Sequence, residues 1–163
     1  MSGNPPLIDV ELSDKFEQEE GRIFISGTQA LARLALIQRE LDRTNGLDTR
    51  GFISGYRGSP LGMLDNTLWR EKKRMEDAGV VFQPGVNKDL AATAVWGTQQ
   101  LEFFPDPLVD GVYAMWYGKA PGVDRSADAM RHGNNFGTHK HGGVLVAVGD
   151  DHPGKSSTVV NQS

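Results

Sequence analysis

The segment from Gly149 to Ser156 has the residue types and spacing of a phosphate-binding loop. Its sequence, GDDHPGKS, fits the pattern G-x-x-x-x-G-K-[ST], in which backbone N–H groups and a lysine hold phosphate groups. However, Pro153 has no N–H to donate, and Asp150 and Asp151 would bring negative charge to an anion site. Only seven residues follow Ser156, too few for the helix that should face the phosphate. We favour a glycine-rich loop after a strand, with a P-loop nucleotide-binding protein as the weaker alternative.

Metal chemistry is suggested only by three histidines. His139 and His141 are two residues apart and could chelate a metal together with His152, but no carboxylate lies at a spacing such as H-E-x-x-H. We therefore expect no metal site formed by this chain. The chain has no cysteine, which excludes a disulfide framework, a cysteine nucleophile and a cysteine-ligated iron–sulfur cluster within it.

Charge is distributed unevenly along the 163 residues. Residues 1–20 hold six acidic side chains against one lysine, a net charge of −5, so the remainder of the chain has a net charge of about +1. The remainder presents no basic face for nucleic acid, and no apolar run approaches the ~18 residues of a membrane span. We expect a cytoplasmic protein with neither nucleic acid nor membrane as a partner, organised as an acidic arm (1–20) and one domain (21–163).

The elements that position these loops alternate between helix and strand. Apolar periodicity and turn residues predict helices at 28–43, 63–79 and 88–103, a short helix after Asp124, and strands at 51–56, 80–85, 112–118 and 142–151. This alternation predicts an α/β fold with a parallel sheet flanked by helices. The last two strands are almost continuously apolar, so we expect both to be covered on both faces. Ligands of such sheets bind outside the carboxyl ends of the strands, which directs attention to the loops there.

Five segments, in order along residues 21–163, resemble one protein family. They are GRIFISGTQAL (21–31), GFISGYRGSPLG (51–62), QPGVNKDLAATAVWGTQQ (83–100), YGKAPGVDRSAD (117–128) and HGGVLVAVGDDHPGKSST (141–158). Together they are similar to the N-terminal part of the fused bacterial indolepyruvate ferredoxin oxidoreductases, which belong to the thiamine-diphosphate-dependent 2-oxoacid:ferredoxin oxidoreductases. The resemblance implies the pyrimidine-binding domain of a thiamine-diphosphate enzyme.

The resemblance also implies roles for individual residues. Tyr56, Ser59 and Pro60 correspond to the family's loop beside the cofactor, and Asn87 precedes its cofactor-activating position. Arg125 is similar to the arginine that receives the substrate carboxylate, a role that suits a planar guanidinium. From the residues alone, the first loop could equally be a plain strand-to-helix turn, and Arg125 could form a surface ion pair with Asp124 or Asp128.

The chain departs from the family at Lys88. Family members place a glutamate there, whose hydrogen bond to the aminopyrimidine ring promotes formation of the reactive carbanion. A protonated lysine can donate a hydrogen bond but cannot share a proton in that way. Asp89 is the nearest acid, but one residue along a helix turns the side chain by about 100°. Lys88, Asp89 and Arg125 are the candidate catalytic residues, and the departure favours a non-catalytic binding module of the same fold as the alternative.

The complete enzyme implied by the resemblance decarboxylates an aryl 2-oxoacid such as indolepyruvate and passes electrons to ferredoxin, releasing an acyl-CoA. Thiamine diphosphate would lie between two domains, with Mg²⁺ and the iron–sulfur clusters held by parts not in this chain. We therefore expect this chain to be a fragment or a stand-alone relative, inactive in isolation. Its partners would be the remaining catalytic domains or subunits, in a homo-oligomer.

Overall fold

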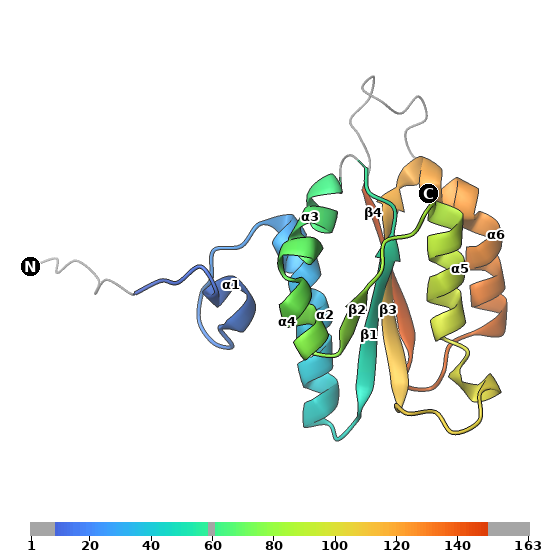
Figure 1. Cartoon of the computed structure of the whole chain (residues 1–163), viewed down its shortest axis with the longest axis horizontal. Helices are drawn as coiled ribbons and strands as arrows, with labels where there is room; N and C mark the ends of the chain where they lie inside the picture. The colour runs from blue at the N-terminus through green and yellow to red at the C-terminus, as the bar shows by residue number, and fades with distance from the viewer. Residues whose placement is uncertain (1–8, 59–60, 150–163) are drawn as a thin grey trace, which may run out of the picture.

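The computed structural model describes residues 9–58 and 61–149, and it has a four-stranded, all-parallel sheet with helices on both faces (Figure 1). The strand order is β2-β1-β3-β4. The elements are α1 (Asp14–Glu17), α2 (Gly27–Thr44), β1 (Thr49–Gly55), α3 (Gly62–Arg70), α4 (Lys72–Asp77), β2 (Val80–Phe82), α5 (Lys88–Thr98), a 3-10 turn η1 (Leu101–Phe103), β3 (Gly111–Lys119), α6 (Ala120–Phe136) and β4 (Gly143–Gly149). The predicted α/β fold class is confirmed.

Helix α2 shows how local sequence sets an element's bounds. The side chain of Ser26 accepts a hydrogen bond from the Gln29 N–H at 3.3 Å, and the Gln29 side chain accepts one from the Ser26 N–H at 3.0 Å. This capping box satisfies backbone donors that the first turn would otherwise leave unpaired. At the other end Gly46 has a φ of 77°, which glycine adopts without strain. The helix predicted at 28–43 is confirmed, with one more residue at each end.

Three helix predictions need correction. The helix predicted at 88–103 ends at Thr98 and is followed by the 3-10 turn η1. The helix predicted at 63–79 is divided into α3 and α4 at Glu71. The short helix expected after Asp124 instead begins at Ala120, directly after β3, and runs for 17 residues. Pro121 lies in its first turn, where the missing N–H has no cost and the fixed φ favours a helix.

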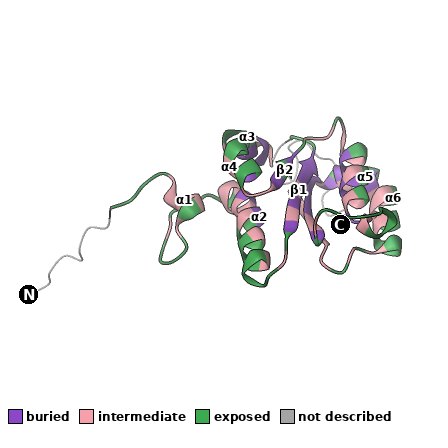
Figure 2. Ribbon diagram, turned by 60° about the horizontal axis from the view of Figure 1, so that its bottom comes forward, coloured by how far each residue is buried: buried purple, intermediate pink, exposed green. Residues whose placement is uncertain are grey.

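Two apolar clusters fill the spaces between the sheet and its helices. The larger lies under α2, α3 and α4 and includes Leu64, Leu68 and Met75, each with an exposed fraction of 0%. The smaller lies under α5 and α6 and is centred on Trp116. Its other buried members are Ala91, Ala92, Val95 and Ala114. Figure 2 shows this burial concentrated along the inner strands. The small alanines of α5 let that helix pack closely on the sheet.

Strand β4 does not have the burial that its apolar sequence predicted. Val144, Leu145, Val146 and Val148 are 40–46% exposed, whereas residues 114–118 of β3 are all buried. The prediction was wrong for β4 because apolar composition does not show which strand lies at the edge of the sheet. Val144 and Val146 line a groove of about 280 Å³ beside α5 and α6. On the other face, Leu145 lines a groove of about 680 Å³ beside α2.

Among the described strands β4 lies at one edge of the sheet, and we expect this edge to make the chain self-associate. Unpaired N–H and C=O groups flanked by exposed valines are a template for pairing with another chain. Val146→Lys should reduce association, measured by light scattering against concentration. The free energy of unfolding should change by less than about 1 kcal/mol, because the side chain is already 42% exposed. Equal association of Val146→Lys and the unchanged chain would contradict this account of the edge.

Residues 14–18 contact the domain rather than extending from it. The guanidinium of Arg33 donates to the backbone oxygens of Lys15, at 2.8 Å, and Gln18. Phe16 packs against the larger cluster, and Glu17 forms an ion pair with Arg74 on α4. Part of the acidic arm thus adds contacts to the face covered by α2. In the portion of the chain that the structure describes, no helix is long and apolar enough to cross a membrane.

Candidate functional site at the carboxyl edge of the sheet

The carboxyl ends of the strands and the N-terminal ends of α3, α5 and α6 meet at one edge of the domain, at the top of Figure 1. This follows from parallel strands joined by helical crossovers. Five sequence-predicted site residues lie there on three separate segments: Tyr56 after β1, Asn87, Lys88 and Asp89 at the start of α5, and Arg125 in α6. Ser59 and Pro60, and the P-loop-like segment after Gly149 with His152, lie outside the described residues.

Asn87 begins α5 and thereby fixes the place of Lys88. Its side-chain oxygen accepts a hydrogen bond from the Leu90 N–H at 2.8 Å, as a helix cap does. The backbone oxygen of Lys88 accepts one from the indole Nε1 of buried Trp116 at 3.1 Å. Asn87 therefore has a structural contact of its own, and the start of α5 is tied to β3 through a core side chain.

The side chain of Lys88 lies across α6 and reaches Tyr56. Its stem passes Gly122 so closely that a Cβ there would lie 2.9 Å from Lys88 Cε. Its ammonium lies 5.4 Å from the centroid of the Tyr56 ring, within the range of a cation–π contact. Tyr56 is held by its own N–H, which donates to the Tyr117 carbonyl at 3.3 Å. The structure thus joins the two residues across separate loops.

Arg125 and Asp89 form an ion pair. The Nε of Arg125 lies 2.9 Å from Oδ2 of Asp89, and the hydroxyl of buried Ser126 lies 3.4 Å from Oδ1. The surface ion pair weighed for Arg125 is present, but its partner is Asp89 on α5 and not Asp124 or Asp128. The Arg125 side chain is 66% exposed, so its other guanidinium nitrogens remain accessible to a carboxylate.

A buried tyrosine–aspartate pair lies beneath the edge and was missed by sequence reasoning. The hydroxyl of Tyr117, on β3, donates to Oδ1 of Asp65, on α3, at 2.6 Å. Both residues are buried, and burial, followed by the hydrogen bond to Asp65, holds the pKa of Tyr117 well above its usual range. Asp65 shares the helix face of Leu61 and Leu68, so an acid on an apolar face was the available signal.

Tyr117→Phe should make the stability of the chain less sensitive to alkaline pH. Because the pKa of Tyr117 is raised on folding, its stabilising effect is complete below pH about 10 and is lost as pH rises above that value. The variant should cost about 1–3 kcal/mol at pH 7, since it leaves Asp65 without its hydroxyl partner. Urea denaturation at pH 7 and above pH 10 measures both effects. If Tyr117→Phe lost as much stability at alkaline pH as the unchanged chain does, the assignment would be contradicted. Tyr56→Phe, which alters an exposed tyrosine, is the control.

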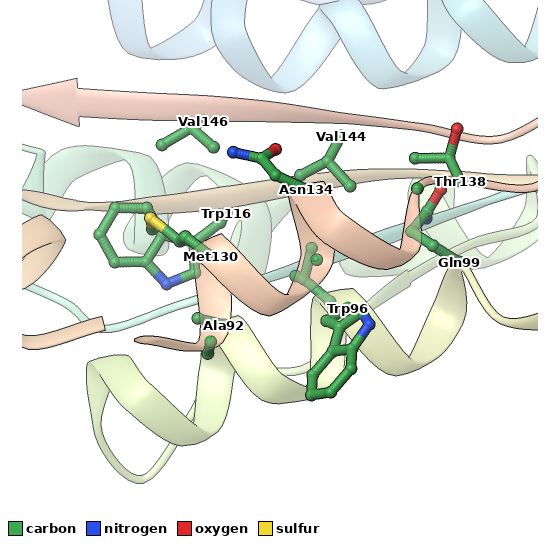
Figure 3. A pocket seen from close by; sticks show the side chains of 13 residues that line it. Ala92, Trp96, Gln99, Trp116, Met130, Asn134, Thr138, Val144 and Val146 are labelled. Atoms are coloured by element: carbon green, nitrogen blue, oxygen red, sulfur yellow. The ribbon is translucent and has the colours of Figure 1, made fainter. Parts of the chain in front are cut away.

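The groove beside β4 is a second concave site (Figure 3). Trp96, Met130 and the two valines of β4 line it, together with Asn134, and its lining contains no titratable side chain. The Nε1 of Trp96 and the Oε1 of Gln99 are buried without a hydrogen-bond partner among the described residues. Both atoms are enclosed, so they present nothing to a molecule in the groove. The groove offers apolar contact, whereas the carboxyl edge offers charged and hydrogen-bonding groups.

The carboxyl edge is therefore the candidate site, where Lys88, the Arg125–Asp89 pair and the ring of Tyr56 lie. Within residues 9–58 and 61–149, no group of three histidine, aspartate or glutamate side chains could hold a metal ion. The rings of His139 and His141 lie 6.2 Å apart at the opposite, amino-terminal edge, before β4. Comparison with protein-family models, with curated proteins and with solved structures gave no match.

Proposed function

We propose that this chain is the pyrimidine-side domain of a thiamine-diphosphate-dependent aryl 2-oxoacid:ferredoxin oxidoreductase of the indolepyruvate type, without turnover of its own. The observation that carries the proposal is the convergence of Tyr56, Lys88 and Arg125, each expected at a cofactor or substrate site, from three segments onto one sheet edge. The ordered resemblance over residues 21–163 supports thiamine diphosphate as the ligand of that edge.

In this proposal the residues of the edge have distinct tasks. The free guanidinium nitrogens of Arg125 would bind the carboxylate of the oxoacid while Asp89 orients the group through Nε. The ring of Tyr56 would pack beside the bound pyrimidine. When bound, thiamine diphosphate supplies the carbanion chemistry, and its diphosphate, Mg²⁺ and the electron-transferring clusters would be held by other domains.

The residues do not fit the step that activates the cofactor. A carboxylate must share a proton with the pyrimidine ring, and position 88 carries an ammonium in its place. Asp89 is not placed to substitute for it, because it lies one residue further along α5 and forms an ion pair with Arg125. Lys88 thus favours a second candidate, a non-catalytic binding module of the same fold, in which the edge binds a ligand without activating it.

A chimera separates the two candidates. Residues 21–163 would replace the corresponding segment of an active indolepyruvate ferredoxin oxidoreductase, and the host would supply the remaining domains. We expect the chimera with Lys88 to assemble but turn over slowly, and Lys88→Glu to raise turnover at least about 100-fold, the size of a proton-transfer contribution. Lys88→Gln is the matched control, because it removes the charge but cannot share a proton. If Lys88→Glu and Lys88→Gln behaved alike, the non-catalytic module would be the better description.

Calorimetric titration of the isolated chain tests separately whether this domain supplies only one side of the cofactor site. With thiamine diphosphate and Mg²⁺ we expect no micromolar binding, because the edge provides one wall of a site that needs two. Micromolar binding by the chain alone would overturn the proposal that other domains complete the site.

A further inference from the structure

Lys88 carries a charge that no described carboxylate neutralises. Within residues 9–58 and 61–149 its ammonium has an aromatic ring as its neighbour, at 5.4 Å, and forms no ion pair. The adjacent acid, Asp89, is taken by Arg125 and Ser126. By contrast, Lys72 and Lys73 on α4 each pair with a carboxylate one helical turn away. The described residues thus supply no carboxylate partner for the ammonium of Lys88.

The lysine is held in place rather than free in solvent. Its backbone oxygen is fixed by the buried indole of Trp116. Its stem lies against Gly122, where any larger residue would displace it. Its ammonium is positioned by the Tyr56 ring. A partly buried lysine with three such contacts loses little side-chain entropy when it binds a partner.

The location of this charge is unfavourable for the fold by itself. Lys88 is the first residue of α5, an 11-residue helix whose N-terminal end carries partial positive charge. The exposed cation Arg57 follows β1 at the same edge. A negative group bound beside Lys88 would offset the repulsion between its ammonium and the N-terminal end of α5.

We propose that the ammonium of Lys88, beside the ring of Tyr56, forms an anion-binding site that takes a carboxylate or phosphate group. The site does not depend on the proposed function, since it rests on the contacts of Lys88 alone. In this proposal Lys88 binds a negative group. This role differs from proton sharing with the pyrimidine ring, which a protonated lysine cannot perform.

Backbone amide NMR of the intact 163-residue chain tests the proposal, with inorganic phosphate and phenylpyruvate as separate titrants and chloride at matched ionic strength. We expect saturable shifts in residues 55–58 and 85–89 with either anion. The tighter of the two anions identifies the ligand group. Lys88→Met should weaken binding at least about 10-fold, the loss expected for one charge-assisted hydrogen bond. Lys73→Met, which removes a paired lysine on α4, should stay within about 2-fold.

Thermal unfolding gives a second readout that does not require a mapped site. Phosphate should raise the unfolding midpoint of the unchanged chain more than chloride does, and this difference should be smaller in Lys88→Met, which keeps only the general stabilising effect of phosphate. In the absence of phosphate Lys88→Met should be at least as stable as the unchanged chain, because a cation is removed from a helix start. Anion binding that survives Lys88→Met, or no saturable shift with either anion, would overturn the proposal.

Discussion

Replacing Trp116 with alanine is expected to lower the free energy of unfolding by about 3–5 kcal/mol, the cost of emptying a large buried aromatic site. The side chain is 1% exposed and lies at the centre of the cluster under α5 and α6. The other buried residues of the cluster are alanines and Val95, which are too small to fill the space that it would leave. The larger Phe52 and Met130 pack against the cluster and are only partly buried. Urea denaturation followed by circular dichroism measures the change.

Trp116→Phe separates packing from the hydrogen bond to α5. Phenylalanine keeps most of the buried volume but loses the donor to the Lys88 oxygen, so the loss should be smaller. Both variants should also release the start of α5 and weaken ligand binding at the carboxyl edge. If Trp116→Ala unfolded at nearly the same urea concentration as the unchanged chain, the assignment of this cluster as a core would be wrong.

Replacing Gly55 with alanine is expected to cost about 3 kcal/mol or more, at the upper end of overpacking effects. A methyl group at Gly55 would overlap the backbone oxygen of Tyr117 and lie 2.6 Å from its ring carbon Cγ. Both belong to β3, which pairs with β1 at this point, so relief would require the two central strands to separate. The adjacent Tyr56 would also be displaced.

Gly97→Ala provides the matched control for the same chemical change. Gly97 lies in α5, and nothing lies within 4 Å of a Cβ placed there. Alanine should therefore stabilise the chain by up to about 1 kcal/mol through its helix propensity. Equal effects of Gly55→Ala and Gly97→Ala in urea denaturation would contradict the close strand contact.

The sequence was enough to predict the sheet and the edge where the predicted residues meet. Alternating helix and strand patterns predicted parallel strands, and their topology brought Tyr56, Lys88 and Arg125 to the carboxyl edge of the sheet. The sequence was not enough to predict which side chains pair with one another. Arg125 pairs with Asp89 because α5 and α6 pack side by side, and no local pattern reports that contact.

Burial was also only partly predictable. The strands β3 and β4 have similar apolar sequences, but among the described strands β3 is paired on both sides and β4 on one. Exposure depends on which neighbours a strand has in space, so composition alone overestimated the burial of β4. The hydrogen bond between Tyr117 and Asp65 joins residues 52 positions apart, which sequence spacing does not reveal.

The most direct test of the central claim is a backbone amide NMR map of the chain titrated with thiamine, which lacks the diphosphate and so separates pyrimidine binding from anion binding. The account predicts weak, millimolar binding with shifts confined to the loops at 55–58 and 83–89 and to the start of α6. Shifts only in the groove lined by Trp96 and Val146, or no shifts at all, would contradict the assignment of the carboxyl edge as the cofactor side of this domain.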